Sequence, residues 1–279
     1  MRLPCVQWKI AYRKSNSDDA RYSLVENPWW GWAADPFLFD YEEKTYLFAE
    51  LWDYRTGKGS LGYKILSERN SKWRVVIDET YHLSYPHIIT IDDDIYMCPE
   101  SNGSNSVYFY KCIQFPNVWE KQAPFITGKY CDTTFFKQQD SLFGFTCNYH
   151  EKPYKLLLFK LDNKGVVFSD NNPILEGEAM TRPGGEFFIR GEKLIRVSQD
   201  NTNYYGEALY FTEAKLNWPQ FTEKVIKRVG VNDCKFWKDI GAIGVHTYNA
   251  NRSYEVVDLK FYKISVINLI CRVAARIKK

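Results

Sequence analysis

Short apolar strands separated by polar or glycine-containing turns run along almost the whole chain, in a unit that recurs about every fifty residues. Each unit opens with a small or polar residue beside proline or threonine, continues as an apolar strand, turns, and returns as an aromatic-rich strand. Four clear openings lie at residues 34–39, 85–89, 131–136 and 182–188. Their marker positions 36, 86, 133 and 183 are 50, 47 and 50 residues apart. Such a period is typical of a β-propeller or a solenoid.

Two further strands are expected after each opening hairpin. The hairpin turns are acidic or contain glycine, which is a common signal for a tight reversal between antiparallel strands. A polar loop and a third alternating strand then follow, at residues 61–65, 107–110, 155–159 and 207–211. A fourth, more exposed strand ends the unit, as at residues 72–76. Four antiparallel strands per repeat make one propeller blade.

The fifth copy of the unit is degenerate. Residues 237–249 lack the opening proline, whereas residues 254–259 provide an expected third strand. Residues 6–12 at the N-terminus are apolar enough to supply a missing outer strand and close the ring. We therefore predict an all-β fold, a five-bladed β-propeller over residues 1–262. A β-sandwich is the main alternative, but it does not explain the regular spacing.

The last residues, 263–279, have a different pattern that predicts a short helix. At 100° per residue, the apolar positions 266, 267, 270, 273, 274 and 277 share one face. Arg272, Arg276 and Lys279 lie on the opposite face. A basic amphipathic helix of this kind can lie on an anionic membrane surface. The alternative is a helix docked on the propeller with its charges in water.

The composition of the chain limits the kinds of function that it fits. Aromatic residues make up 17% of the chain, which favours strands and also suits surfaces that stack on sugars. The net charge of +3 gives no electrostatic reason to expect nucleic acid as a partner. The seven cysteines are scattered and form no CxxC pair, so we expect reduced thiols rather than zinc ligands. No signal peptide and no stretch of about 18 apolar residues is present. We expect a cytoplasmic protein, peripheral on the inner face of the cell membrane.

The propeller geometry predicts where polar side chains converge, because the starts of the innermost strands surround one axis. The blade openings contribute Asp35, His87, Asp132, Arg182 and Glu186. The ends of second strands and the loops after them contribute Glu50, Glu100, Gln199, Asp200, Tyr205 and His246. Several carboxylates beside imidazoles and a guanidinium suit sugar chemistry, in which one carboxyl donates a proton and another accepts one or attacks. The alternative for a single Asp before Pro or Thr is a turn cap.

Among these residues, we expect Asp35, Glu100 and Asp132 to be catalytic and the remainder to bind substrate. Arg182 precedes Pro-Gly-Gly, whose glycines let the backbone approach a ligand closely, and its guanidinium suits a phosphate or carboxylate. Nucleotide-binding glycine motifs and HExxH are absent, and the acidic run at residues 92–94 fits a solvated turn. We therefore expect no cofactor and no metal.

Residues 34–39 with residues 46–50 resemble the first blade of five-bladed furanosidase-type propellers, which include arabinanases, fructosidases and levansucrases. The resemblance implies that Asp35, which precedes the first strand, is catalytic. This chain differs from the arabinanases at the second blade, where it has His87 in place of their Asp. Glu100 and Glu186 are both open choices for the general acid.

The N-terminal domain of plant glucosamine inositolphosphorylceramide transferases is a closer resemblance. That domain also occurs alone, or beside formyltransferase domains, in bacterial surface-polysaccharide clusters. The matching elements are residues 35–39, 85–88, 99–101, 132–136, 182–185, 196–200 and 205–206. The resemblance implies a five-bladed propeller acting on glycans.

Three functions follow from these observations. The first is a glycosyltransferase that moves a sugar from a phosphorylated donor to a glycan or glycolipid acceptor, such as a lipid-linked surface polysaccharide intermediate. The second is a furanosidase-type glycoside hydrolase. The third is a non-catalytic propeller that binds glycans.

Overall fold

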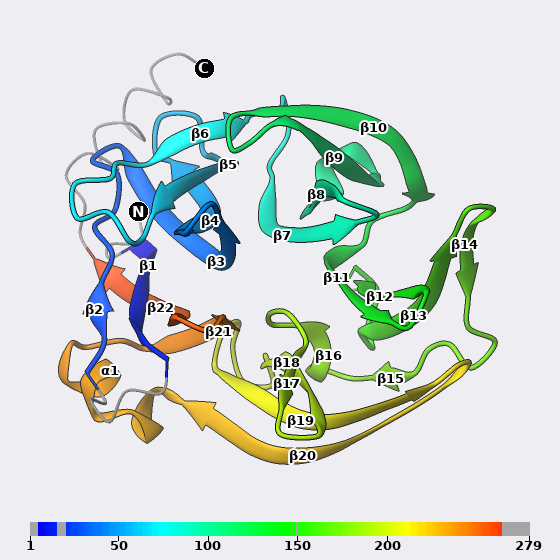
Figure 1. The fold of residues 1–279 in the computed structure, drawn as a ribbon. Helices are drawn as coiled ribbons and strands as arrows, with labels where there is room; N and C mark the ends of the chain where they lie inside the picture. The colour runs from blue at the N-terminus through cyan, green and yellow to red at the C-terminus, as the bar shows by residue number, and fades with distance from the viewer. Residues whose placement is uncertain (1–4, 16–20, 149, 264–279) are drawn as a thin grey trace, which may run out of the picture.

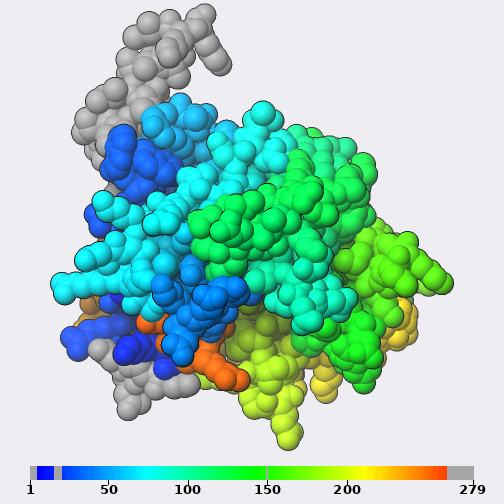
Figure 2. All heavy atoms as spheres, turned by 45° about the horizontal axis from the view of Figure 1, so that its top comes forward, coloured from blue at the N-terminus to red at the C-terminus, as the bar shows by residue number. Residues whose placement is uncertain are grey.

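The protein is an all-β five-bladed propeller, as the periodicity predicted. The structure, a computed structural model, describes residues 5–15, 21–148 and 150–263. Five antiparallel sheets are arranged radially about one axis, with β3, β7, β11, β16 and β21 innermost (Figure 1). Neighbouring blades pack against each other in chain order, as the all-atom view shows (Figure 2). Distant parts of the sequence therefore meet at the axis.

The first four blades follow the chain order. Blade 1 contains β3 (Gly31–Tyr41), β4 (Lys44–Asp53), β5 (Lys58–Ile65) and β6 (Arg74–Ile77). Blade 2 contains β7 (Ser84–Ile91), β8 (Asp94–Glu100), the short helix η1 (Asn102–Ser104), β9 (Ser106–Gln114) and β10 (Val118–Thr127). Blade 3 contains β11 (Cys131–Gln138), β12 (Ser141–Asn148), β13 (Lys155–Asp162), β14 (Gly165–Phe168) and β15 (Leu175–Glu176). Blade 4 contains β16 (Ala179–Pro183), β17 (Phe188–Arg190), β18 (Lys193–Asp200), β19 (Ala208–Asn217) and β20 (Gln220–Gly230).

The fifth blade joins the two ends of the described chain. Its inner strands are β21 (Gly244–Ala250) and β22 (Tyr254–Lys263), and it is completed by β1 (Cys5–Lys14) and β2 (Ser23–Leu24). β1 pairs with β22 along its whole length, so the ring closes through the N-terminal strand, as expected. The predicted strand order was wrong in one respect, because β22 is the second strand and β1 the third. The helices η2 (Val231–Asp233) and α1 (Lys235–Asp239) precede β21.

A β-bulge recurs near the start of each inner strand. The strand register shifts at Ala34/Phe37, Ser84/His87, Cys131/Thr134, Ala179/Pro183 and Val245/Tyr248. In the first three blades, the bulged residue has a positive φ: 49° at Asp35, 49° at Tyr85 and 50° at Asp132. A bulge bends the strand and redirects a side chain. The repeated bulge thus explains why polar residues gather at one level of the axis.

Aromatic side chains fill the spaces between blades. Between blades 1 and 2, the buried cluster includes Phe37, Phe48 and Tyr85. Between blades 2 and 3, Phe109 and Phe135 lie 5.2 Å apart between ring centroids. Most of the aromatic residues therefore serve packing, one of the two uses expected for them.

The membrane expectations concern residues beyond the described part of the chain. No helix among the described residues is long and apolar enough to cross a membrane. The predicted amphipathic helix, with Arg272, Arg276 and Lys279, lies outside the described residues.

Candidate active site

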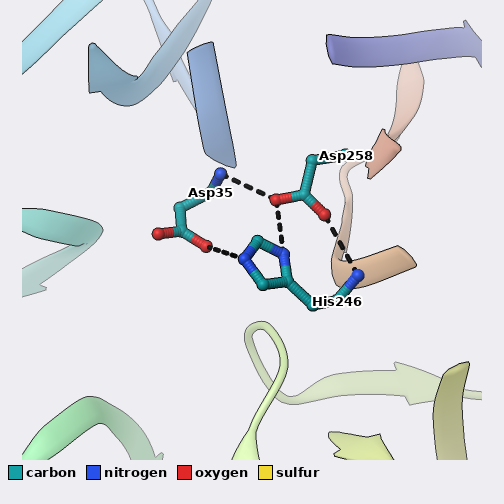
Figure 3. Close-up of side chains that lie close together, drawn as sticks. All are labelled: Asp35, His246 and Asp258. Atoms are coloured by element: carbon teal, nitrogen blue, oxygen red, sulfur yellow. Dashed lines mark hydrogen bonds and ion pairs between the residues drawn. The ribbon is translucent and has the colours of Figure 1, made fainter. Parts of the chain in front are cut away.

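Blades 1 and 5 meet at a buried group formed by Asp35, His246 and Asp258 (Figure 3). The Nδ1 atom of His246 is 2.7 Å from Oδ2 of Asp258, and its Nε2 atom is 3.7 Å from Oδ1 of Asp35. The backbone N–H of Asp35 donates to Oδ2 of Asp258 at 2.9 Å. His246 thus lies between two carboxyl groups, and Asp258 holds both the His246 ring and the Asp35 backbone in place.

The Asp35 carboxyl group is held from two other sides. The Thr247 hydroxyl donates to Oδ1 at 2.8 Å, and the backbone N–H of Tyr85 donates to Oδ2 at 3.1 Å. Burial raises the pKa of Asp35 to about 6; the charge of His246 opposes this shift, while Asp258 adds to it. Asp35 is therefore an oriented carboxyl group that changes charge near neutral pH.

Aromatic rings enclose His246. The Trp8 ring stacks on it at 3.9 Å between centroids, and the Tyr205 ring meets it edge-on at 5.2 Å. Burial alone lowers the pKa of His246, but the charges of Asp258 and Asp35 outweigh burial and raise it above the ordinary value. This environment favours an imidazolium ion beside Asp35.

A second group, formed by blades 2, 3 and 4, centres on Arg182. Its Nε donates to Oδ2 of Asp132 in an ion pair, and its Nη2 lies 3.2 Å from Oε2 of Glu100. The side-chain amide of Gln199 also donates to Asp132, at 3.1 Å. The guanidinium carbon lies 5.2 Å from the centroid of the Tyr205 ring. Tyr205 is 42% exposed and contacts both groups, so the cluster reaches solvent at this residue.

Two glutamates in the cluster have altered acidity. Burial raises the pKa of Glu100 well above its ordinary value; Arg182 opposes the shift, and Asp132 reinforces it. Burial also raises the pKa of Glu50, with Asp35 and Glu100 contributing. Among the described residues, Oε1 of Glu50 is buried without a hydrogen-bond partner, and Nε2 of His82 lies 3.8 Å from it. Both glutamates therefore favour the protonated form, which can donate a proton.

Tyr85 lies below this level and links four blades. Its backbone contacts Asp35 of blade 1, and its hydroxyl lies 2.7 Å from Oγ1 of Thr134 in blade 3. The backbone N–H of Gly185 in blade 4 donates to the same hydroxyl at 2.9 Å. The Tyr85 side chain is fully buried. It thus crosses the axis and forms a floor beneath the carboxyl groups.

The structure groups His87 and Glu186 separately from that cluster. His87 lies two residues after Tyr85 in β7, and Glu186 lies between β16 and β17. Nε2 of His87 accepts a hydrogen bond from the backbone N–H of Phe135 at 3.2 Å. Nδ1 of His87 is 3.8 Å from Oε1 of Glu186. Burial lowers the pKa of His87 to about 3 and raises that of Glu186. The position equivalent to Asp35 in blade 2 belongs to Tyr85, not His87, because Tyr85 occupies the bulge.

Two other predicted placements differ from the structure. Asp200 ends the second strand of blade 4, but its carboxylate binds Arg228 at 2.7 Å and the Thr202 hydroxyl at 2.6 Å. Arg228 belongs to the outer strand β20, so Asp200 is directed along its blade. His246 lies in the bulge of an inner strand rather than at the end of a second strand.

Asp258 was not among the residues expected at the axis from sequence. It lies within an alternating strand, where it looks like an exposed position. It faces the bulge of β21 instead, and it accepts hydrogen bonds from the backbone N–H groups of His246 and Thr247. Because β22 is the second strand of its blade, Asp258 lies next to the inner strand β21.

Two sets of side chains have the residue types and proximity of metal ligands. These sets are Asp35, His246 and Asp258, and Glu100, Cys131 and Asp132. In the first, Asp258 already accepts three backbone N–H groups. In the second, the Arg182 cation contacts both carboxylates. Protein groups therefore supply compensating charge in both sets.

Comparison with known proteins identifies relatives of this chain. The family model described as glucosamine inositolphosphorylceramide transferase 1, N-terminal, matches residues 26–255. The transferase of that name from Oryza sativa subsp. japonica is 29% identical over 216 residues, covering 72% of this chain and 29% of the relative. The Arabidopsis thaliana protein is 27% identical over 195 residues, covering 66% and 25%. The chain thus spans less than a third of the length of these curated relatives.

Solved structures share the fold at low sequence identity. A GH32 β-fructofuranosidase from Bombyx mori aligns with a TM-score of 0.58 and 16% identity, covering 82% of this chain and 55% of the other. An α-L-arabinanase from Cellvibrio cellulosa aligns with a TM-score of 0.52 and 12% identity, covering 81% and 93%. At these identities the likeness establishes the propeller fold alone.

Proposed function

Because this chain belongs to the family of the N-terminal domain of glucosamine inositolphosphorylceramide transferase 1, we propose that it transfers a sugar to a glycan or glycolipid acceptor. The relatives are named as sugar transferases, although this chain corresponds to only part of their length. The proposed donor is a phosphorylated sugar, and the proposed acceptor is a lipid-linked surface polysaccharide intermediate. The proposed place of action is the cytoplasmic face of the cell membrane.

One observation carries the proposal: carboxyl groups from four blades gather near one axis, and their acidity differs. Asp35 has a pKa of about 6 and is mostly ionised above neutral pH. Glu100 has a raised pKa and favours the protonated form. Transfer of a glycosyl group uses these two states, because one group must accept or attack while another donates a proton. A buried carboxyl group that had neither a partner nor a function would destabilise the fold.

In the proposed mechanism, ionised Asp35 removes the proton from the acceptor hydroxyl as its oxygen bonds to the anomeric carbon. The bond from that carbon to the donor leaving group breaks, and Glu100 gives its proton to the departing oxygen. The proton taken by Asp35 returns to Glu100 through solvent after product release. Asp132 and Arg182 hold Glu100 in position, and Tyr205 provides a ring against which a sugar stacks.

Arg182 has a different role in this proposal from the one expected from sequence. Its guanidinium lies between Asp132 and Glu100, so its charge is largely compensated by the protein. A donor phosphate whose leaving oxygen lies at Glu100 would therefore share Arg182 with these two carboxyl groups. The phosphate-binding role of Arg182 stays a prediction, which the Arg182→Lys variant tests through the KM for the donor.

The test is a transfer assay with the full chain. A panel of nucleotide sugars and lipid-phosphate sugars is incubated with membrane lipid extract, and labelled glycolipid is measured. We expect one donor to be used, and Asp35→Asn to reduce kcat at least 100-fold, the usual minimum for loss of a general base. Asp200→Asn, away from the cluster, is the matched control. Transfer that is unaffected by Asp35→Asn would contradict the mechanism.

Hydrolysis of a glycosidic bond is the second candidate function. It is favoured by the excess of carboxyl groups at the axis and the compensated charge of Arg182, which disfavour binding of a polyanionic donor there. This function predicts release of reducing sugar from arabinan- or fructan-like oligosaccharides without any donor, abolished by the same Asp35→Asn change. Saturable oligosaccharide binding without turnover in either assay would instead identify a glycan-binding propeller.

A further inference from the structure

A large groove opens between blades 4 and 5, away from the axial carboxyl groups. It lies between β17–β20 and the β21–β22–β1 sheet, next to α1 (Figure 1). Its volume is about 750 Å³, which falls within the range of roughly 300–1,000 Å³ found for small-molecule sites. Nothing in the reaction proposed above uses this groove.

The walls of the groove are apolar. They include Phe188, Phe211, Leu209 and Val229 of blade 4 and Tyr248 of blade 5. These side chains belong to one cluster that packs between the two blades. These side chains give the groove apolar walls, which suit a hydrocarbon chain.

The rim of the groove is exposed and apolar at two further points. Ile189 is 63% exposed and Ile226 is 52% exposed, and both line the groove. Large aliphatic side chains that remain in water beside an apolar groove are typical of a surface that is covered in use.

The same rim carries an excess of positive charge. Arg13, Arg190, Lys193, Lys227 and Arg252 line the groove, and Glu255 is the only carboxylate among its described lining residues. Arg13 is paired with Glu255, and Lys193 with Glu213. Arg190, Lys227 and Arg252 form no ion pair with any described residue, so three cations face solvent around the apolar walls.

Trp237 of α1 also lines the groove. Its indole N–H is buried and has no hydrogen-bond partner among the described residues. A buried donor without a partner costs free energy. Because Trp237 lines the groove, its fluorescence reports on an occupant.

From these features we propose that the groove binds an anionic lipid, with an acyl chain against the apolar walls and the headgroup phosphate against Arg190, Lys227 and Arg252. Cations beside exposed aliphatic side chains match the two parts of such a molecule and the surface of an anionic membrane. This proposal does not depend on which reaction the axial cluster performs.

Monomeric decyl phosphate tests the groove directly. Titration of the full chain, followed by tryptophan fluorescence and calorimetry, should show one saturable site. Decyl maltoside, which lacks the charge, and inorganic phosphate, which lacks the chain, should each bind at least tenfold more weakly. Equal binding of inorganic phosphate would reduce the site to an anion patch and overturn the proposal, as would equal binding of decyl maltoside.

Charge-reversal variants locate the site. A cation near an anionic lipid surface contributes about 1 kcal/mol, or about fivefold in affinity, so Arg190→Glu with Lys227→Glu should weaken decyl phosphate binding at least ~30-fold. Lys72→Glu with Lys164→Glu, which changes the same net charge at exposed positions on other blades, should leave it unchanged. Trp237→Phe should keep binding but remove most of the fluorescence change. Equal weakening by both charge-reversed pairs would overturn the proposal.

Vesicles separate the groove from the C-terminal residues. Flotation with phosphatidylcholine vesicles that contain phosphatidylglycerol should show binding, which the groove variant reduces. Arg272→Glu with Arg276→Glu is the comparison, because the sequence also predicts a basic surface there. A groove variant that floats like the wild-type protein, while the C-terminal variant does not float, would assign lipid binding to the C-terminal residues and refute the groove site.

Discussion

Replacement of Arg182 by methionine tests whether the axial carboxyl groups form one coupled cluster. Arg182→Met keeps most of the side-chain volume but leaves Asp132 and Glu100 without their shared cation. Removal of one partner from a buried ion pair costs about 3–5 kcal/mol. A protein of this size loses about 2–4 °C in Tm per kcal/mol, so we expect Tm to fall by about 10 °C.

The loss of stability caused by Arg182→Met should depend on pH in a defined direction. Burial and Asp132 already raise the pKa of Glu100, and Arg182 opposes them, so its removal raises this pKa further. A carboxyl group whose folded pKa exceeds its unfolded value binds its proton more tightly in the folded state. The folded variant is therefore favoured at low pH and loses stability as the pH rises through the folded pKa. The difference in Tm between variant and wild type should be smaller at pH 5 than at pH 8.

Two variants control this measurement. Arg228→Met removes an arginine that pairs with Asp200 and Glu207 but is 39% exposed, so solvent screens these pairs and the change should cost less than Arg182→Met. The double variant Arg182→Met with Asp132→Asn removes one of the stranded charges and should recover part of the lost stability. If Arg182→Met and Arg228→Met behave alike at both pH values, the cluster is not coupled as described.

Three further changes probe the framework of the site. Asp258→Asn should lower the pKa of His246 because it removes the closest negative charge, and NMR titration of the imidazole measures this; an unchanged pKa would contradict the assigned contact. Tyr85→Phe should cost about 1–3 kcal/mol in urea unfolding because a buried N–H loses its acceptor, and a neutral result would show that the floor is not held by that hydroxyl. Gly185→Ala should prevent stable folding, since its Cβ would lie 1.9 Å from the Tyr248 carbonyl oxygen at a φ of +148°; soluble, native-like protein would refute this packing.

The sequence predicted the blade repeat and most of the axial residues because both follow from spacing. Asp35, Asp132 and Arg182 each stand at a blade opening, and the radial arrangement brings them together. The errors arise where the repeat is irregular. His87 follows the bulge that Tyr85 occupies, and a bulge shifts the register by one residue in a way that spacing does not reveal.

The partners of each side chain were beyond prediction for a different reason. Asp200 and Glu100 both end second strands, yet Asp200 binds an arginine from its own blade and Glu100 one from across the axis. The arginine that pairs with each carboxyl group is set by the direction and length of the side chains in the folded protein. Asp258 was missed because the fifth blade is assembled from both ends of the chain, which moved β22 inward by one strand.

The closure of the ring by β1 has a consequence for how the protein is made. Residues 5–14 leave the ribosome well before their pairing partner, residues 254–263. Blade 5 stays incomplete, with the β1 edge unpaired, until residues 254–263 have been synthesised. His246 and Asp258 belong to that blade, so the axial cluster is complete only after both have emerged, and a nascent chain that stops before residue 254 lacks Asp258.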